Sequence, residues 1–386
     1  MSGTSLGLAI GALVCALAAL AIALYVLVKY RRTAPAPQGN QMGSHRTHTP
    51  GPPALVVNSV KVPNLAAFRH QCNRIADQCH LPRPLWYTTT VEEQGEEQAR
   101  QAVAAGASVV VAVGGDGTVR QVARALVGTQ TPMALVPMGT GNLLARNLQM
   151  TFGSTQERIT AAFTGRDRAI DVGWMRAAPL TDSEVEEVRK SRIFADLVEN
   201  FGEVPQADPA VEYIFLVMGG LGFDAAMVGG ADNNLKARIG WMAYTFAALR
   251  HSMGRRIQAR MWIGDEKSPE ELRARTILFA NCGRLPGGVA LLPDAELDDG
   301  WLDIAAIDTT GGPLGWMSVG GKILLRGMGI RRPTVSVDPG RIVFRRGRTA
   351  RVQSRWPVAV QADGDIIGIS RRVEVRVSRN KLIVRS

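Results

Sequence analysis

Two glycine-rich turns hold the residue types in this sequence that are best suited to phosphate chemistry. One is GGDGT at residues 114–118, and the other is PMGTGN at residues 137–142. Glycine has no Cβ, so backbone N–H groups in such turns can approach phosphate oxygens, and a following helix N-terminus favours negative charge. Asp116 would repel phosphate unless Mg²⁺ intervened, and Mg²⁺ prefers carboxylate and phosphate oxygens as ligands. The two turns therefore predict a site for a nucleotide and its metal ion.

Several familiar catalytic signatures are absent from the sequence. It has no GxxxxGK[ST] motif, no GxGxxG motif and no HRD and DFG pair, which argues against P-loop enzymes, Rossmann dehydrogenases and protein kinases. The four cysteines are scattered, which excludes a disulfide scaffold and a cysteine-based zinc finger. The chemistry must therefore come from the two turns and the residues that the fold brings to them.

The elements that must position these turns follow a strand–helix alternation before residue 150. Short apolar or β-branched runs predict strands at residues 55–57, 86–90, 108–113 and 134–136. Apolar periodicity predicts helices at residues 65–78, 92–105, 119–126 and 143–148. This order predicts a parallel α/β sheet, and each glycine-rich turn follows the carboxyl end of a strand, where open α/β sheets bind ligands.

The second half of the chain has a different pattern. From about residue 214, many short segments alternate apolar and polar residues, which predicts antiparallel strands. One helix with an apolar face is predicted near residues 235–253, and residues 176–209 form an acidic insertion. The expected fold class is an α/β domain at 54–171 followed by a β-sandwich domain at 172–386, with the return of the last strand to the first domain as an alternative.

The N-terminal segment is expected to anchor the chain in a membrane. Residues 6–28 carry no charge, and a helix of this length spans about 35 Å, enough for a hydrocarbon core of about 30 Å. Lys29, Arg31 and Arg32 follow the segment, so the positive-inside rule places the N-terminus outside and the rest of the chain in the cytoplasm. Residues 33–53 are rich in proline and glycine and predict a flexible linker. The expected localisation is the cell membrane.

Positive charge is concentrated near the C-terminus. The chain has 45 Lys and Arg against 34 Asp and Glu, and residues 321–386 contain 16 of the former against 4 of the latter. A basic region predicts an anionic partner such as a lipid headgroup, a nucleotide or a nucleic acid. The sequence has no RNA-binding or DNA-binding motif, so nucleic acid is not expected.

The run VVVAVGGDGTVRQVARAL, followed closely by LVPMGTGNLLARNL, resembles the catalytic domain of the diacylglycerol kinase and sphingosine kinase family, in particular the bacterial soluble lipid kinases. The resemblance extends from residue 55 to the C-terminus through GGLGFDA (219–225), KARIGWMAY (236–244), NCGRLPGG (281–288), LLPDAELDDGWLD (291–303) and VQADGD (360–365). It implies an NAD-kinase-like α/β nucleotide domain packed on a β-sandwich, with ATP and a lipid meeting in the cleft between them.

The resemblance also implies functions for individual residues. It places the ATP triphosphate and its Mg²⁺ at Gly114, Gly115, Asp116, Gly117 and Thr118, with further ATP contacts from Asn58, Thr90, Gly139, Thr140 and Asn142. Thr88 and Thr89 are alternatives to Thr90. A second Mg²⁺ site, which orders the structure in the family, is expected at Asp299 with backbone groups near Glu296 and Trp301. Asp363 and Asp365 match the family's catalytic signature, in which one acid is the general base towards the lipid hydroxyl. We favour Asp365 as the base and Asp363 as its partner.

Three positions depart from the family pattern. Asn58 is followed by Ser59 where Asn-Pro is frequent, and Asn142 is followed by Leu143 where Asn-Asp is frequent. Asp365 stands where Glu is usual, which shortens the reach of the carboxylate by one methylene. A misplacement of about 1 Å can cost about 10²-fold in rate, so these departures bear directly on activity.

The leading prediction is an ATP-dependent lipid kinase that phosphorylates a neutral membrane lipid, with diacylglycerol as the acceptor and phosphatidic acid as the product. A sphingoid base, a ceramide-like lipid and a polyprenol-type alcohol are alternative acceptors. Two other interpretations stay open: a catalytically weak, lipid-binding regulatory protein, and an NAD kinase, which shares the GGDGT turn. The expected partners are the lipid substrate and the bilayer, and a homodimer is one alternative for the oligomeric state.

Overall fold

A computed structural model of the chain describes residues 51–150, 153–222, 256–284, 291–292, 294–309 and 340–386. The predicted membrane helix at 6–28, most of the linker at 33–53 and the predicted helix near 235–253 lie outside these residues. Among the helices of the described residues, none is long and apolar enough to cross a membrane.

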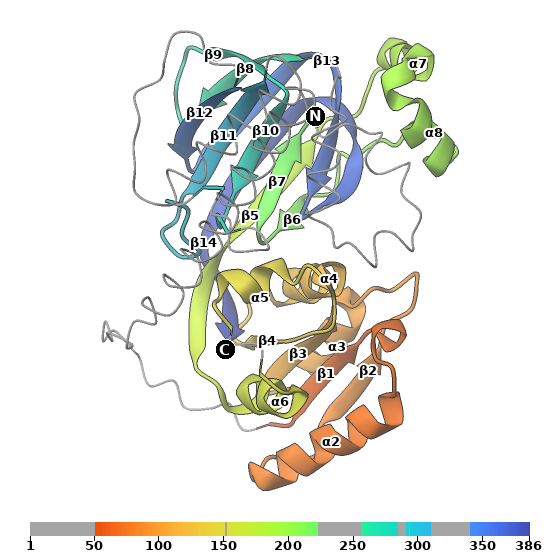
Figure 1. The fold of residues 1–386 in the computed structure, drawn as a ribbon, viewed down its shortest axis with the longest axis vertical. Coiled ribbons are helices and arrows are strands. Elements are labelled where there is room, and N and C mark those ends of the chain that lie inside the picture. Colours follow the sequence, from red (N-terminus) through yellow and green to blue (C-terminus); the bar gives the residue numbers. More distant parts are fainter. Residues whose placement is uncertain (1–50, 151–152, 223–255, 285–290, 293, 310–339) are drawn as a thin grey trace, which may run out of the picture. The chain divides into compact units, whose positions relative to one another are not determined.

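Four parallel strands form the first half of the fold (Figure 1). They are β1 (Pro53–Val57), β2 (Leu85–Thr88), β3 (Val109–Gly114) and β4 (Met133–Pro137), in the spatial order β2-β1-β3-β4. Every residue of β1, β3 and β4 is buried, as expected for apolar runs that are covered on both faces.

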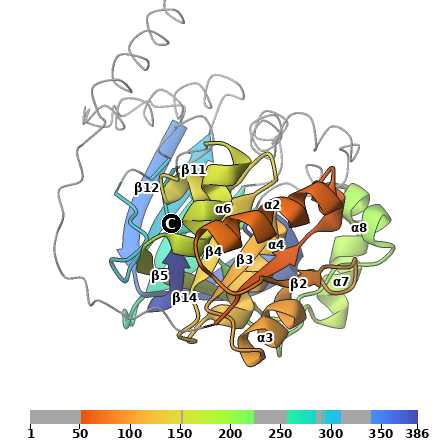
Figure 2. The same ribbon diagram turned by 90° about the horizontal axis from the view of Figure 1, so that it is seen from below.

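Helices cover both faces of these strands (Figure 2). The short helical turn η1 (Ser59–Lys61) follows β1, and the helices are α2 (Leu65–Gln78), α3 (Glu96–Ala104), α4 (Asp116–Leu126), α5 (Leu143–Asn147) and α6 (Thr155–Thr164). The apolar sides of α2 and α6 pack on one face of the sheet, and those of α3 and α4 pack on the other. Val119, Val122 and Leu126, the predicted apolar stripe of α4, are buried in this way.

The β2–α3 connection differs from the sequence prediction. The second strand ends at Thr88 and not at Thr90, and the following helix begins at Glu96 and not at Glu92. Two local features explain the difference: the Thr90 hydroxyl accepts a hydrogen bond from Glu93 N–H at 3.0 Å, and Gly95 has φ of 131°. A threonine turn and a positive φ both interrupt regular structure, and neither changes the apolar periodicity of the sequence.

The second half of the fold is built from antiparallel strands. They are β5 (Asp167–Ala177), β6 (Tyr213–Phe215), β7 (Met218–Leu221), β8 (Ile257–Ile263), β9 (Glu270–Ala274), β10 (Thr276–Ala280), β11 (Leu302–Thr309), β12 (Gly340–Gly347), β13 (Thr349–Ala362) and β14 (Asp365–Arg385). These strands enclose a core of their own, which includes Phe215, Phe279 and Trp356. The arrangement is a β-sandwich beside the α/β half.

The sheet of the α/β half is mixed and not purely parallel, because the long strand β14 joins the two halves. Near its C-terminal end, Val384 pairs in parallel with Met133 of β4, while the rest of β14 pairs in antiparallel with β5 and β13. Hydrogen bonding therefore continues from β12 to β2 through one sheet. The expected boundary at residues 171–172 falls inside β5, and β5 pairs with β14 along both halves.

The acidic insertion at 176–209 contains helical structure. It contains α7 (Asp182–Lys190), η2 (Arg192–Phe194) and α8 (Ala195–Phe201). Val188 and Leu197 pack with Ile369 of β14 in a small apolar cluster, and Glu184 pairs with Arg371 at 2.9 Å. The insertion is therefore held against the β-sandwich by both apolar and ionic contacts.

Candidate active site

A tight hairpin between β13 and β14 determines where the two candidate catalytic acids point. Ala362 pairs with Asp365, so Asp363 and Gly364 alone form the turn. Both turn residues have positive φ, 47° and 89°. Two-residue hairpins favour this conformation, and Asp-Gly is among the sequences that adopt it. The turn separates the directions of the two carboxylates, which would otherwise lie on the same side of a strand.

The carboxylate of Asp363 is enclosed by backbone donors. It accepts hydrogen bonds from the N–H groups of Leu216, Val217 and Met218 at 2.8, 2.9 and 2.9 Å. Burial raises the pKa of Asp363, against the lowering effect of Arg120 and the three N–H groups. With its lone pairs used in this way, Asp363 holds the β6–β7 segment in place and is poorly suited to accept a substrate proton.

Asp365 is the accessible acid of the pair. Its side chain is 62% exposed, and it forms an ion pair with Arg120 of α4. The Arg120 side chain is only 12% exposed, and its other terminal nitrogen donates to the carbonyl of Ala362. Arg120 therefore links the α/β half to the β13–β14 hairpin of the sandwich, and Asp365 is the acid of the pair that is open to solvent and near enough to Asp116 to raise its pKa.

Asp116 joins the two glycine-rich turns to each other. Its two carboxylate oxygens accept hydrogen bonds from Asn142 N–H at 2.9 Å and from Leu143 N–H at 2.7 Å. A Cβ at Gly141 would lie 2.6 Å from an Asp116 oxygen, so only glycine fits there without a shift. Burial raises the pKa of Asp116, and the neighbouring charge of Asp365 acts in the same direction. The carboxylate is thus both a structural tie and a neighbour of the candidate base.

The remaining residues of the two turns pack closely. Asn142, with φ of 47°, accepts from Gly139 N–H at 3.1 Å and donates to the Gly139 carbonyl at 2.6 Å. A Cβ on Gly139 would meet the Cα of Gly115 at 3.0 Å, so the turns touch through glycine backbone. Open space surrounds Gly117, where an added Cβ would meet no atom within 4 Å.

Four more of the predicted ATP contacts, Asn58, Thr90, Thr118 and Thr140, differ in their burial and in their hydrogen-bond partners. Thr118 is buried, and its hydroxyl lies 3.4 Å from the side-chain nitrogen of Asn58. A Cβ on Gly114 would lie 2.7 Å from that hydroxyl. Thr140 is exposed on the second turn. Thr90 lies beyond the end of β2, and its hydroxyl accepts from Glu93 N–H and also hydrogen-bonds the side chain of Glu92, so both partners are local.

The residues predicted to form a second Mg²⁺ site are Asp299, Glu296 and Trp301, and the Asp299 carboxylate is already engaged by groups of the protein. One carboxylate oxygen of Asp299 accepts from Trp301 N–H at 2.9 Å, and the other pairs with the Arg346 guanidinium. Arg346 also lies 3.6 Å from Asp303. Glu296 is exposed. Because Arg346 already neutralises Asp299, these contacts do not fit a divalent cation. Across the described residues, no three Asp, Glu, His or Cys side chains converge as a metal site.

We expect the fold around Asp299 to be independent of magnesium. A cation at a hundredfold excess over its dissociation constant would stabilise the protein by about 2.7 kcal/mol. The unfolding midpoint of the nucleotide-free full chain should therefore be the same in Mg²⁺ and in EDTA. In Arg346→Gln, which removes the counter-charge, Mg²⁺ should raise the midpoint. A clear stabilisation of the unmodified chain by Mg²⁺ would contradict the expectation.

Sequence reasoning missed two residues that organise this region. Arg120 lies one helical turn after Asp116 on α4, so the spacing of four residues was the available signal. Asp171 of β5 is fully buried, and it accepts from Gly300 N–H at 2.5 Å and Asn380 N–H at 2.7 Å. Nothing local marks Asp171, because its partners lie 129 and 209 residues away.

Comparisons with known proteins identify two family domains in the chain. Residues 66–175 match the diacylglycerol kinase catalytic domain, and residues 218–384 match the YegS C-terminal NAD kinase beta sandwich-like domain. A probable YegS-like lipid kinase of Pseudomonas aeruginosa is 30% identical over 255 residues, which cover 64% of this chain and 72% of that protein. The chain belongs to the diacylglycerol kinase and YegS-like lipid kinase family. The resemblance inferred from the sequence motifs is thereby confirmed.

Other matches of this lipid kinase family member are partial. A diacylglycerol kinase of Mycobacterium tuberculosis is 31% identical over 206 residues, which cover 53% of this chain and 56% of that protein. An uncharacterized protein of Synechocystis is 28% identical over 276 residues, which cover 70% of this chain and 53% of that protein. The chain thus spans about half the length of these two relatives. A crystal structure of a diacylglycerol kinase from Bacillus anthracis has a TM-score of 0.61 at 15% identity, covering 88% of this chain and 97% of that one, which supports the shared fold.

Proposed function

We propose that this protein transfers the γ-phosphate of ATP to the hydroxyl of a neutral membrane lipid, with diacylglycerol as the leading acceptor and phosphatidic acid as the product. Membership of a family of kinases supports the reaction class. The observation that carries the proposal is the bridge from α4 to the hairpin. Through Arg120, an accessible carboxylate at Asp365 is held beside a glycine-rich turn that contains Asp116.

The two glycine-rich turns are the proposed ATP site. The open space at Gly117 and the start of α4 leave room and backbone donors for phosphate oxygens. Asn142 and the exposed Thr140 border this space from the second turn. Mg²⁺, when bound with the nucleotide, would neutralise phosphate charge, and Asp116 is the carboxylate of the two turns that would hold it. Thr90 is the weakest of the predicted contacts because its hydroxyl already caps a local turn.

Asp365 is the proposed general base. It takes the proton of the lipid hydroxyl as that oxygen bonds to the γ-phosphorus, and the bond from the γ-phosphorus to the bridging oxygen breaks to release ADP. In the structure the carboxylate of Asp365 is engaged in an ion pair with Arg120. The negative charge of a bound triphosphate gives Arg120 a competing partner, and its movement towards phosphate would free Asp365. Asp363 acts as a positioning residue that holds the hairpin.

The proposal includes attachment to a membrane. The uncharged segment at 6–28 and the basic residues after it favour a single-pass anchor with a cytoplasmic catalytic body. The bilayer would then supply the lipid substrate, and the basic C-terminal region would favour an anionic lipid surface. A protease-protection experiment on membrane vesicles tests the orientation, because the catalytic body should be cleaved only in vesicles with the cytoplasmic face outside.

The deciding experiment is transfer of labelled γ-phosphate from ATP by the full chain in mixed micelles, each carrying one candidate lipid. We expect label in diacylglycerol with unmodified protein and at least about 10²-fold less with Asp116→Ala, because the turns lose their tie and the metal loses its carboxylate. Asp265→Ala, an exposed acid on the β8–β9 loop, is the control. Label in another candidate lipid, and not in diacylglycerol, would identify that lipid as the acceptor. Binding of ATP or lipid with no transfer to any lipid would favour the regulatory protein, and transfer to NAD would favour an NAD kinase.

A further inference from the structure

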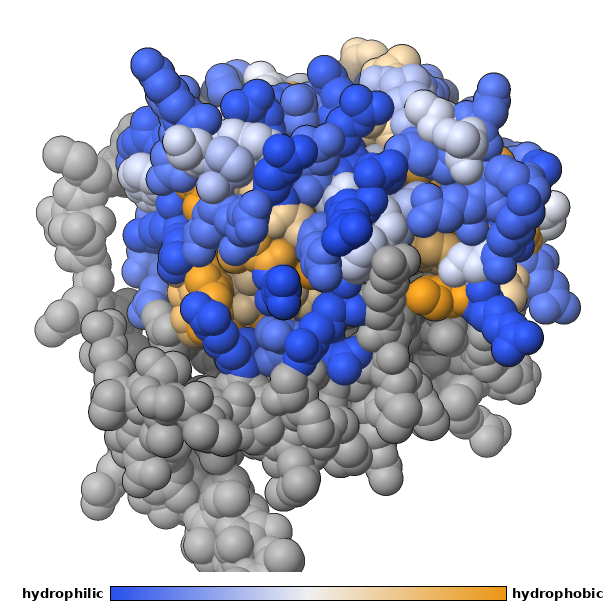
Figure 3. Space-filling view, turned by 90° about the horizontal axis from the view of Figure 1, so that it is seen from above, coloured by the Kyte–Doolittle hydropathy of each residue, from blue (hydrophilic) through white to orange (hydrophobic). Residues whose placement is uncertain are grey.

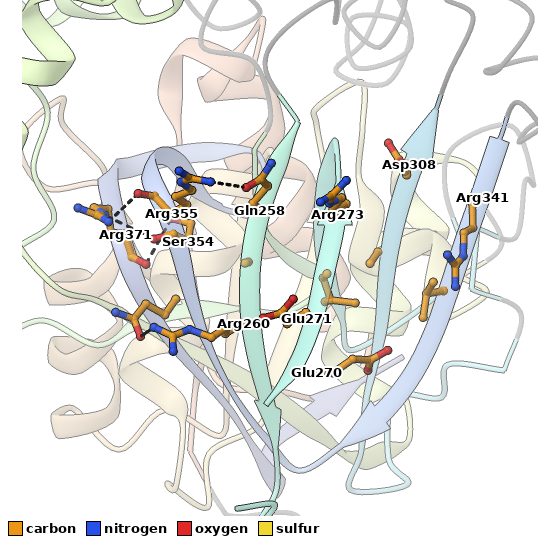
Figure 4. A pocket seen from close by; sticks show the side chains of 15 residues that line it. Gln258, Arg260, Glu270, Glu271, Arg273, Asp308, Arg341, Ser354, Arg355 and Arg371 are labelled. Atoms are coloured by element: carbon orange, nitrogen blue, oxygen red, sulfur yellow. Dashed lines mark hydrogen bonds between the residues drawn. The ribbon is translucent and has the colours of Figure 1, made fainter. Parts of the chain in front are cut away.

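The β-sandwich contains a second candidate ligand site, apart from the glycine-rich turns. A cavity of about 620 Å³ is lined by residues of β8, β9, β11, β12, β13 and β14 (Figure 4). None of its lining residues belongs to the α/β half or to the Asp363–Gly364 hairpin turn. Its volume lies in the range of small-molecule sites, about 300–1,000 Å³.

Arginine dominates the charged lining of this cavity. Its charged side chains are Arg260, Arg273, Arg341, Arg355, Arg371, Glu270, Glu271 and Asp308. Two of the three acids are neutralised by arginines outside the lining: Glu270 by Arg345 at 2.6 Å and Asp308 by Arg256 at 3.0 Å. The third acid, Glu271, lies opposite Arg260 in the β8–β9 register. The lining therefore keeps an excess of positive charge.

Four of the five arginines are gathered at one end of the cavity. Arg371, Arg355, Arg273 and Arg341 line that end, while Arg260 lies with Glu271 and Glu270 towards the other (Figure 4). Asp308 also lies at the arginine end, where Arg256 neutralises it. This separation matters because Coulomb attraction falls with distance, so an anion at the arginine end would avoid the two glutamates.

Two of these arginines are held in place, and the other two make no ion pair among the residues that the structure describes. Arg371 donates to Glu184 at 2.9 Å and to the Arg355 carbonyl at 2.6 Å, and Arg355 donates to Gln258 at 3.2 Å. The two without an ion pair are Arg273 on β9 and Arg341 on β12. Arg341 lies opposite Asp308 of β11 in the strand register, and Asp308 lies between the two arginines (Figure 4). Guanidinium groups present several donors in a fixed plane that matches phosphate oxygens.

Part of the cavity lining is apolar. Ala259, Leu272 and Ala306 line the cavity and belong to the apolar core of the sandwich. Viewed from the sandwich end, the described surface is mainly hydrophilic, with small apolar areas set among hydrophilic side chains (Figure 3). A ligand that satisfies both parts of the lining carries an anionic head and an apolar body.

We propose that this cavity binds a phosphate monoester attached to an apolar body, with the phosphate at the arginine end of the cavity, where Arg273 and Arg341 are the guanidinium groups without an ion pair among the described residues. The proposal concerns a site separate from the proposed kinase centre and does not depend on phosphoryl transfer. A phosphorylated lipid has this chemistry, and inorganic phosphate shares only its head.

Calorimetric titration of the purified full chain tests the proposal with three soluble probes: dihexanoyl phosphatidate, dihexanoylglycerol and inorganic phosphate. The variant is Arg273→Gln/Arg341→Gln, and the matched control is Arg74→Gln/Arg83→Gln, which removes the same charge from two exposed arginines of the α/β half. We expect the variant to weaken phosphatidate binding by about 10- to 100-fold, because the phosphate loses charge-assisted hydrogen bonds from two guanidinium groups. The control should bind like the unmodified protein, and an unchanged unfolding midpoint shows that the variant is folded.

Each other outcome would overturn part or all of the proposal. Equal phosphatidate binding by the variant and the unmodified protein would exclude the cavity as the site. Equal affinity for inorganic phosphate and phosphatidate would show that the apolar body of the ligand does not contribute to binding. If the variant weakened binding of dihexanoylglycerol as much as binding of phosphatidate, the ligand of the cavity would not need a phosphate. These results would leave the kinase proposal untouched, because they measure binding and not transfer.

Discussion

Asp365→Asn is expected to lower the rate of lipid phosphorylation by about 10²- to 10⁴-fold, the usual contribution of a positioned general base. Asparagine keeps the size of the side chain and cannot accept the proton of the lipid hydroxyl. It also loses the charge that pairs with Arg120, so ATP binding should be equal or tighter, since Arg120 would no longer be shared with a carboxylate. The measurement is kcat for phosphate transfer beside a direct titration with ATP.

Asp265→Asn is the matched control for Asp365→Asn, because it makes the same chemical change on an exposed loop far along the chain. It should retain full activity. If Asp365→Asn phosphorylated lipid at the normal rate, another group would have to take the proton. Asp365→Glu restores the side chain that is usual in the family and should keep activity. Its added methylene moves the carboxylate, so the size of the rate depends on how well the longer side chain fits the site.

Asp363→Gly is expected to destabilise the fold by about 3 kcal/mol. The substitution removes the acceptor of three backbone N–H groups, and an unsatisfied buried donor costs about 1–3 kcal/mol. Glycine adopts the positive φ of this position without strain, so the loss reports on the carboxylate and not on the turn. The measurement is the free energy of unfolding of the full chain in urea.

Asp363→Asn separates the hydrogen bonds from the charge. It keeps one acceptor oxygen and tolerates the left-handed conformation, so it should lose only about 1 kcal/mol. Asp265→Gly, the control on an exposed loop, should change the free energy of unfolding by only about 0.5 kcal/mol. A loss of similar size for Asp265→Gly and Asp363→Gly would mean that the three N–H contacts do not stabilise the fold.

Much of the α/β half could be predicted from local patterns. The buried runs at β1, β3 and β4 and the stripe on α4 are properties of consecutive residues, because a strand covered on both faces must be apolar throughout. The glycine-rich turns at 114–118 and 139–142 were likewise visible, since a close backbone approach requires residues without a Cβ. The ends of β2 and α3 were less predictable because a threonine turn and a positive φ at Gly95 decide them.

The choice between the two hairpin acids needed the tertiary structure. Asp363 and Asp365 are equivalent in sequence, and the Asp-Gly pair signals only that a turn lies between them. What distinguishes them is that three N–H groups from residues about 145 positions away enclose Asp363, while Arg120, 245 positions away, pairs with Asp365. The separation of function between the acids is a product of packing.

The family, the α/β-then-β order and the residues of the two glycine-rich turns could be inferred from local sequence patterns, because they depend on short-range periodicity and on residues that only one backbone shape accepts. Three contacts became visible only in the folded chain: Asp116 ties the turns together, Arg120 pairs with Asp365, and Arg346 neutralises Asp299. Each of these contacts joins residues that are far apart along the chain, and their partners become known only when the strands are placed in register.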